Sequence, residues 1–168
     1  MEVLLTVERN LTQNFRSRVR CCAMNLTPNF TLEELIFSST AHARGISNTP
    51  TPDAVEHLHV LAAGLERVRA ILGHAMHIDS GYRSPELNHL VRGVPNSAHV
   101  TGYAADFLCP EYGTPLEIVQ RLHNDIDLEF DQIIQEGTWV HISFAPAMRR
   151  QVLTAHFANG SASYSLGV

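Results

Sequence analysis

Apolar residues between positions 52 and 72 recur at steps of three and four, which predicts a long amphipathic helix with one buried face. Pro52 suits the first turn of such a helix and Gly73 suits its end. His57 and His59 are two positions apart and cannot share a helix face, so we expect both on the surface. The predicted apolar face comprises Val55, Leu58, Leu61 or Ala62, Leu65, Val68 and Leu72.

Shorter patterns predict further helices and several strands. Thr31 with Glu34 three residues later forms a capping box, which predicts a helix that begins at Leu32. Ser84 and Thr114 are each followed by proline, which predicts helices over 84–91 and 114–124. Alternating apolar and polar residues predict strands over 75–79, 102–108, 130–135, 138–144 and 149–157. The strands 130–135 and 138–144 are joined across Glu136-Gly137, as in a hairpin.

Because helices come first and strands cluster later, the pattern favours an α+β domain with a mainly antiparallel sheet and helices packed on one side. Residues 25–168 are expected to form this single domain. Residues 1–24 contain the basic stretch NFRSRVRCCAM and lack periodicity, so they are interpreted as a flexible amino-terminal extension. Two interpretations stay open: a segment upstream of a natural start at Met24, or a genuine flexible arm.

The composition restricts the classes of function. The net charge of −5 argues against a nucleic-acid-binding protein, and no apolar run approaches the length of a membrane span. Glu2 and a short apolar patch at the start do not resemble a signal peptide, so synthesis in the cytoplasm is expected. Three cysteines, Cys21, Cys22 and Cys109, form no disulfide framework. A monomer is expected.

The stretch SAHVTGYAADF, residues 97–107, carries the chemistry. Asp106 lies in an apolar run, where an unpaired carboxylate would be costly to bury, so it is either paired with a cation or exposed. His99 lies seven positions before it, and His141 alternates with polar and aromatic residues in TWVHISF. Two imidazoles and a carboxylate are suitable ligands for a catalytic zinc with one open position. Gly102 would let the chain turn sharply between His99 and the strand that contains Asp106.

The pattern S-x-H-x-x-G-x-A-x-D over residues 97–106 resembles the motif of zinc peptidases related to D-alanyl-D-alanine carboxypeptidases, a group that includes hedgehog signalling domains. The segments SGYRSPELN (80–88) and WVHISF (139–144) resemble the flanking segments of phage and bacterial members. The resemblance covers about residues 26–145. It implies that fold, with His99, Asp106 and His141 as the zinc ligands.

The same resemblance implies that Arg83 contacts the substrate carbonyl or its developing oxyanion, and Ser97 is at most a substrate or loop contact. The sequence departs from the family at the general base. Many relatives have a carboxylate three residues before the last histidine, and others have a histidine two before it, but here these positions are Thr138 and Trp139. Glu136 is the nearest upstream carboxylate, with Asp131 as the next candidate.

The resemblance implies a zinc-dependent peptidase that hydrolyses peptidoglycan stem-peptide bonds involving D-amino acids, as a carboxypeptidase or an endopeptidase. The alternative is a non-catalytic, zinc-containing module that binds peptidoglycan in a phage or cell-wall assembly. A metal-free structural domain would require an accidental motif match. With no signal peptide recognised, action at the cell wall would follow lysis or depend on a phage particle.

Overall fold

The computed structural model describes residues 24–158 and 161–168, so the predicted extension lies outside the described residues except for Met24. Cys21 and Cys22 also lie outside them, while Cys109 is a buried free thiol. The described elements, in chain order, are α2 (Leu32–Ile36), α3 (Ser39–Arg44), α4 (Pro52–Leu72), β1 (His77–Ser80), α5 (Pro85–Leu90), α6 (Ala98–Thr101), β2 (Ala104–Leu108), α7 (Pro115–His123), β3 (Gln132–Gln135), β4 (Val140–Ser143), β5 (Gln151–Ala158) and β6 (Ser161–Leu166).

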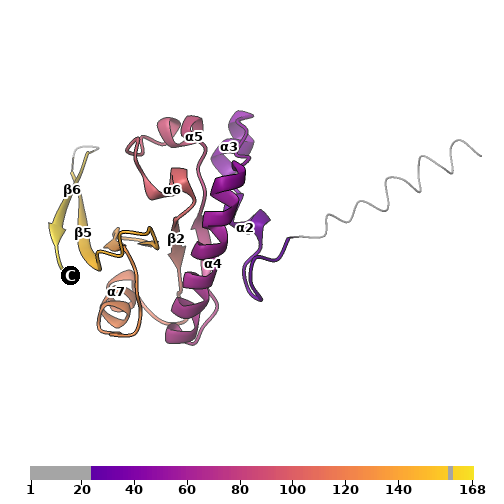
Figure 1. Ribbon diagram of the computed structural model, residues 1–168. Helices are drawn as coiled ribbons and strands as arrows, with labels where there is room; N and C mark the ends of the chain where they lie inside the picture. The colour runs from indigo at the N-terminus through magenta and orange to yellow at the C-terminus, as the bar shows by residue number, and fades with distance from the viewer. Residues whose placement is uncertain (1–23, 159–160) are drawn as a thin grey trace, which may run out of the picture.

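The strands form one six-stranded sheet in the order β1-β2-β4-β3-β5-β6. The sheet is mixed, because β5 lies parallel to β3 while the other neighbouring strands are antiparallel. The α+β class is therefore confirmed. Strands β3 and β4 form the predicted hairpin, and β5 and β6 form a second hairpin at the end of the sheet away from α4 (Figure 1).

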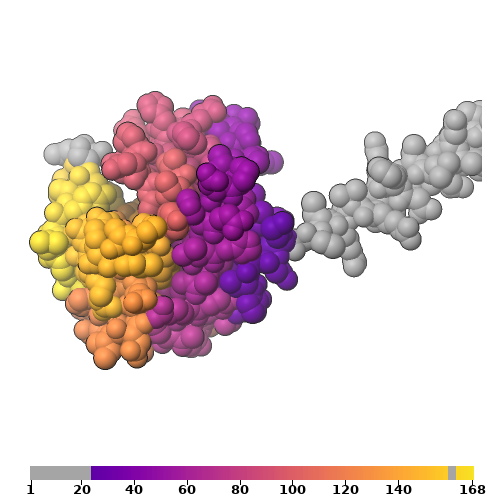
Figure 2. Space-filling view, in the orientation of Figure 1, coloured from indigo at the N-terminus to yellow at the C-terminus, as the bar shows by residue number. Residues whose placement is uncertain are grey.

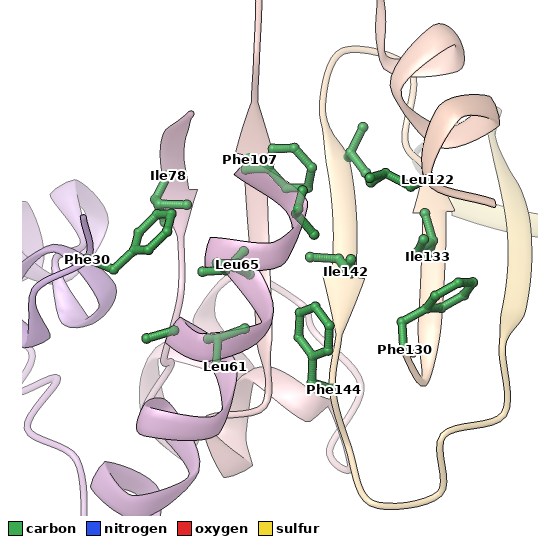
Figure 3. Close-up of a cluster of buried hydrophobic side chains, with 14 of the residues drawn as sticks. Phe30, Leu61, Leu65, Ile78, Phe107, Leu122, Phe130, Ile133, Ile142 and Phe144 are labelled. Atoms are coloured by element: carbon green, nitrogen blue, oxygen red, sulfur yellow. The ribbon is translucent and has the colours of Figure 1, made fainter. Parts of the chain in front are cut away.

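Helix α4 contributes eight buried residues to the core. Thr51 caps its first turn, and Gly73 ends it in a left-handed conformation. Leu58, Leu61 and Leu65 are fully buried, and each contributes about 1.5–3 kcal/mol through removal from water. Figure 3 shows the leucines of α4 facing aromatic and aliphatic side chains of the sheet. The predicted apolar face is confirmed, although Val55 is only partly buried.

The three short helices predicted from capping residues are present. The side chains of Thr31, Ser84 and Thr114 each accept a hydrogen bond from a backbone N–H in the first turn of α2, α5 and α7. At α7 the capping box is complete, because Glu117 accepts from the Thr114 backbone. Within the described ranges, no helix combines the length and apolar character needed to cross a bilayer.

Candidate metal centre

Strands β2 and β4 place two of the predicted ligands opposite each other. Asp106 and His141 are direct partners in the antiparallel ladder. Because side chains alternate between the faces of a strand, both point away from the face that carries Phe107 and Ile142. That second face packs into the hydrophobic core. The same alternation that builds the core therefore puts a carboxylate and an imidazole together on the opposite face.

The third predicted ligand, His99, lies in the short helix α6 rather than in a loop. Its ring Nδ1 lies 2.6 Å from the carbonyl oxygen of Gly81. A carbonyl can only accept, so Nδ1 donates and the lone pair is on Nε2. The ring is thus held with Nε2 toward Asp106.

Gly102 ends α6 with φ +83, which confirms the sharp turn predicted there. A Cβ at this position would also lie 2.8 Å from the carbonyl oxygen of Ala54 in α4. His57 is partly buried rather than fully exposed, and its Nδ1 donates to the carbonyl of Thr101 at 2.7 Å. Its ring also stacks on Tyr103. Helix α4 therefore fixes the position of α6, and with it the position of His99.

Three donor atoms converge in the buried centre: His99 Nε2, Asp106 Oδ1 and His141 Nδ1. They lie 2.9–3.2 Å from one another. In tetrahedral zinc sites with bonds of 2.0–2.1 Å, ligand atoms lie about 3.3 Å apart, so a small outward movement would admit the ion. The three side chains form a group that could hold a metal ion.

Arg83 binds the second oxygen of the same carboxylate. Its Nη2 donates to Asp106 Oδ2, and its Nε donates to Ser80 Oγ at 2.9 Å. The backbone N–H of Arg83 also donates to the carbonyl of His99 at 3.1 Å. Arg83 was expected to contact the substrate; in the structure its guanidinium binds the carboxylate of Asp106, a candidate metal ligand. Buried Asp106 is therefore paired with a cation of the chain itself, in addition to any metal ion that the site would hold.

The protonation states suit metal binding. Burial alone would raise the pKa of Asp106, but the imidazoles of His99 and His141 outweigh it and hold the pKa well below its usual range. Burial lowers the pKa of His99, against the opposing charge of Asp106. An ionised carboxylate and a neutral imidazole are the forms that bind a metal.

Glu136 lies in the β3–β4 turn two residues after Ile134, the ladder partner of His141, so strand alternation puts it on the same face as His141. Its backbone N–H donates to the carbonyl of Trp139 at 3.1 Å, and Gly137 adopts φ +72 between them. Burial raises the pKa of Glu136, and the charge of Asp106 raises it further. The indole N–H of Trp139 approaches the carboxylate closely enough to lower its pKa, but it completes no hydrogen bond within the described residues. Glu136 is therefore within electrostatic reach of the three-residue group.

The other carboxylate considered from the sequence, Asp131, is engaged elsewhere. Arg149 donates to both of its oxygens, at 2.8 and 2.6 Å. This hydrogen bonding outweighs burial and lowers the pKa of Asp131. Ser97 caps α6 by accepting a hydrogen bond from the backbone N–H of His99 at 3.3 Å. Asp131 is thus held in an ion pair with Arg149, and Ser97 serves as a helix cap.

Two residues that were not predicted from the sequence, Gly81 and Asn48, support these side chains. A Cβ at Gly81 would lie 2.2 Å from the carbonyl of Leu35, so only glycine brings the Gly81 carbonyl to His99. The Asn48 side chain donates to the carbonyl of Tyr82 and accepts from the N–H of Ser84, which ties down the same loop. In the segment SGYRS the arginine suggested a functional role, and the glycine before it indicates a close approach of the backbone to another segment.

These observations define a class of protein. It has an α+β fold and a buried group of two histidines and one aspartate, with a half-buried glutamate on the same face. The family model of Peptidase M15 matches residues 28–143, and the chain belongs to this family of zinc-dependent, D-alanyl-D-alanine carboxypeptidase-like peptidases. A search of curated proteins found no match. Family membership supports a metallopeptidase, and the His99–Asp106–His141 group fits a metal site.

Proposed function

We propose that this chain is a zinc-dependent peptidase that hydrolyses peptidoglycan stem-peptide bonds involving D-amino acids. The observation that carries the proposal is the convergence of three buried donor atoms with Glu136 on the same face of the sheet. Membership of the Peptidase M15 family supports the reaction class, and the resemblance of residues 97–106 to the motif of its cell-wall members supports the substrate class.

His99, Asp106 and His141 would hold the zinc ion. Their donor set fits it, because two imidazole nitrogens and one carboxylate oxygen leave a fourth position open for catalysis. When bound, zinc would polarise the peptide carbonyl and lower the pKa of a water molecule to about 7. Arg83 would keep Asp106 oriented, since it occupies the oxygen that faces away from the histidines.

Glu136 would act as the general base. Its raised pKa moves it toward the pH at which proton transfer from water is efficient. The carboxylate removes one proton from the attacking water while the water oxygen bonds to the carbonyl carbon. The protonated carboxyl then gives that proton to the amine nitrogen as the C–N bond breaks.

Arg83 has a second role open to it. Its Nη1 makes no hydrogen bond within the described parts of the chain, and its side chain keeps 19% of its exposure. This nitrogen would donate to the substrate oxygen as negative charge develops on it. Support of Asp106 and contact with the substrate are thus compatible in one guanidinium.

The test is cleavage by the zinc-loaded protein of purified peptidoglycan and of a soluble stem pentapeptide that ends in D-alanyl-D-alanine, with mass analysis of the released fragments. Glu136→Gln should lower kcat by about 10²–10⁴, because it keeps the shape but removes the proton acceptor. Zinc content should stay near one per chain. Glu129→Gln, an exposed acid just before β3, is the control and should cleave normally.

The second candidate is a module that binds cell-wall peptide without cutting it. The observation that favours it is the absence of a carboxylate or histidine at positions 138 and 139, where many relatives have a base. Wild-type protein that retains zinc and binds peptidoglycan in a pull-down, but releases no fragment from either substrate, would establish this module and exclude the peptidase.

A further inference from the structure

The β5–β6 hairpin extends the face of the sheet that carries the metal centre. Strand register places Ile134 opposite His141, Leu153 beside Ile134, and Leu166 opposite Leu153. Paired residues in neighbouring strands point to the same face. An apolar row therefore runs from His141 across β3 and β5 to the edge strand β6.

A second row runs parallel to the first through the candidate base. Gln135 pairs with Val140 and with Thr154, so the next residue, Glu136, is flanked by Trp139 on one side and Ala155 on the other. Ala155 pairs in turn with Tyr164. The ring of Phe157, two residues beyond Ala155, lies 6.4 Å from the Trp139 ring, centroid to centroid. Trp139 therefore lies beside Glu136, and Tyr164 lies on the same face one strand beyond Ala155.

These two rows form a floor and a wall. Ile134 and Ala155 are each only 7% exposed and form the floor. Phe157, Tyr164 and Leu166 are 58%, 53% and 82% exposed, which leaves three large apolar side chains on one hairpin in contact with solvent. In Figure 2 the hairpin, coloured gold to yellow, forms an exposed edge of the molecule beside the segment of α5 and α6. Grouped exposed apolar side chains next to a site indicate a binding surface.

Tyr164 of the hairpin lies close enough to the site for the charges of the site to affect its pKa. Burial raises the pKa of Tyr164, and the carboxylates of Glu136 and Asp106 raise it further, so the phenol lies within reach of both. The hairpin lies beyond residues 28–143, the part of the chain that matches the family model. Its aromatic wall is therefore a feature of this chain rather than of the matched family region.

We propose that the β5–β6 hairpin is the specificity wall of the peptidase: a peptide substrate lies across the strands from the metal centre to β6, with its apolar side chains against Phe157, Tyr164 and Leu166. Three strand spacings of about 4.8 Å separate β4 from β6, which gives roughly 14 Å, or about four residues of extended peptide on one side of the scissile bond. This inference rests on the proposed function.

The test measures kinetics with stem-type peptides lengthened one residue at a time, on the amino or the carboxyl side of the cleaved bond. In the wild type, kcat/KM should rise with length on one side and level off at about four residues. Phe157→Ala and Tyr164→Ala should each raise KM about 2- to 10-fold for the long peptides, with kcat nearly unchanged, because an aromatic contact is removed but no reacting group is. The shortest peptides should show no such effect.

His156→Ala is the matched control, because His156 lies on the same strand but on the opposite face. Equal KM values for wild type, both hairpin variants and the control would overturn the proposal even if the enzyme is active. Trp139, the single tryptophan of the chain, provides a separate readout by fluorescence. If the wild type cleaves nothing but its fluorescence still reports binding that the hairpin variants weaken, the peptidase fails and the wall remains.

Discussion

Replacing Arg83 with alanine tests whether the guanidinium supports the metal centre. Arg83 and Asp106 form a largely buried pair, with side-chain exposures of 19% and 10%. Loss of one partner of a buried pair can cost about 3–5 kcal/mol, but bound zinc would compensate the charge left on Asp106. The expected effect of Arg83→Ala is therefore the one typical of a residue that orients a metal ligand. Metal affinity should fall about 10- to 100-fold, or about 1.4–2.7 kcal/mol.

The assay is a zinc titration against a chromogenic chelator, followed by peptidase kinetics at saturating zinc. Arg83→Lys should be intermediate, because one ammonium group cannot reproduce the planar fork that reaches both Ser80 and Asp106. Arg121→Ala is the control, since Arg121 forms a partly exposed pair with Asp125, one turn further along the chain at the end of α7. Wild-type zinc affinity in Arg83→Ala would refute the supporting role. A fall in kcat/KM at saturating zinc would then assign Arg83 to the substrate alone.

Three further outcomes are expected. Because folding raises the pKa of Glu136, the stability that its protonated form contributes is present at acidic pH and is lost as the pH rises through that pKa. In chelator-treated protein, the thermal midpoint of Glu136→Gln should therefore exceed that of the wild type increasingly toward neutral pH. Equal midpoints at every pH would contradict this. Gly102→Ala should cost about 2–4 kcal/mol in denaturant unfolding and weaken zinc binding, more than Gly73→Ala, whose added Cβ meets no atom within 4 Å. Removal of residues 1–23 should leave the thermal midpoint unchanged, because Met24 is held by the Glu33 carboxylate; a large drop would show that the boundary is misplaced.

The elements predicted correctly from the sequence are those determined by local signals, namely capping residues and the spacing of apolar residues. Caps at Thr31, Ser84 and Thr114 and the spacing of apolar residues in α4 located four helices correctly. The segments that escaped prediction are short or polar: α3, α6 and β6. In β6 the alternation of serine with larger residues resembles a loop until pairing with β5 supplies the hydrogen bonds. The parallel β3–β5 pairing depends on a long-range path of the chain and has no local signature.

For the site, motif spacing predicted which residues converge but not what holds them. His99, Asp106 and His141 come together as expected. The placement of Arg83 on Asp106 was not predictable, because it depends on the register between β1 and β2, which pairs Ser80 with Asp106. For the general base, the sequence favoured Glu136 and kept Asp131 as the next candidate. In the structure Asp131 is paired with Arg149, a contact that sequence spacing does not predict.

Two features of this chain are in contact: the residue at the usual base position and the second hairpin. At position 139, where some relatives have a histidine, this chain has a tryptophan whose ring packs near Phe157 of β5. That aromatic contact needs a strand beyond β3, which β5 supplies. Glu136 lies directly across the turn from Trp139, so it is on the face of the metal centre although it is five residues from His141 in sequence. The proposed base is thus a carboxylate across the turn from position 139, and the tryptophan at position 139 is part of the proposed substrate wall.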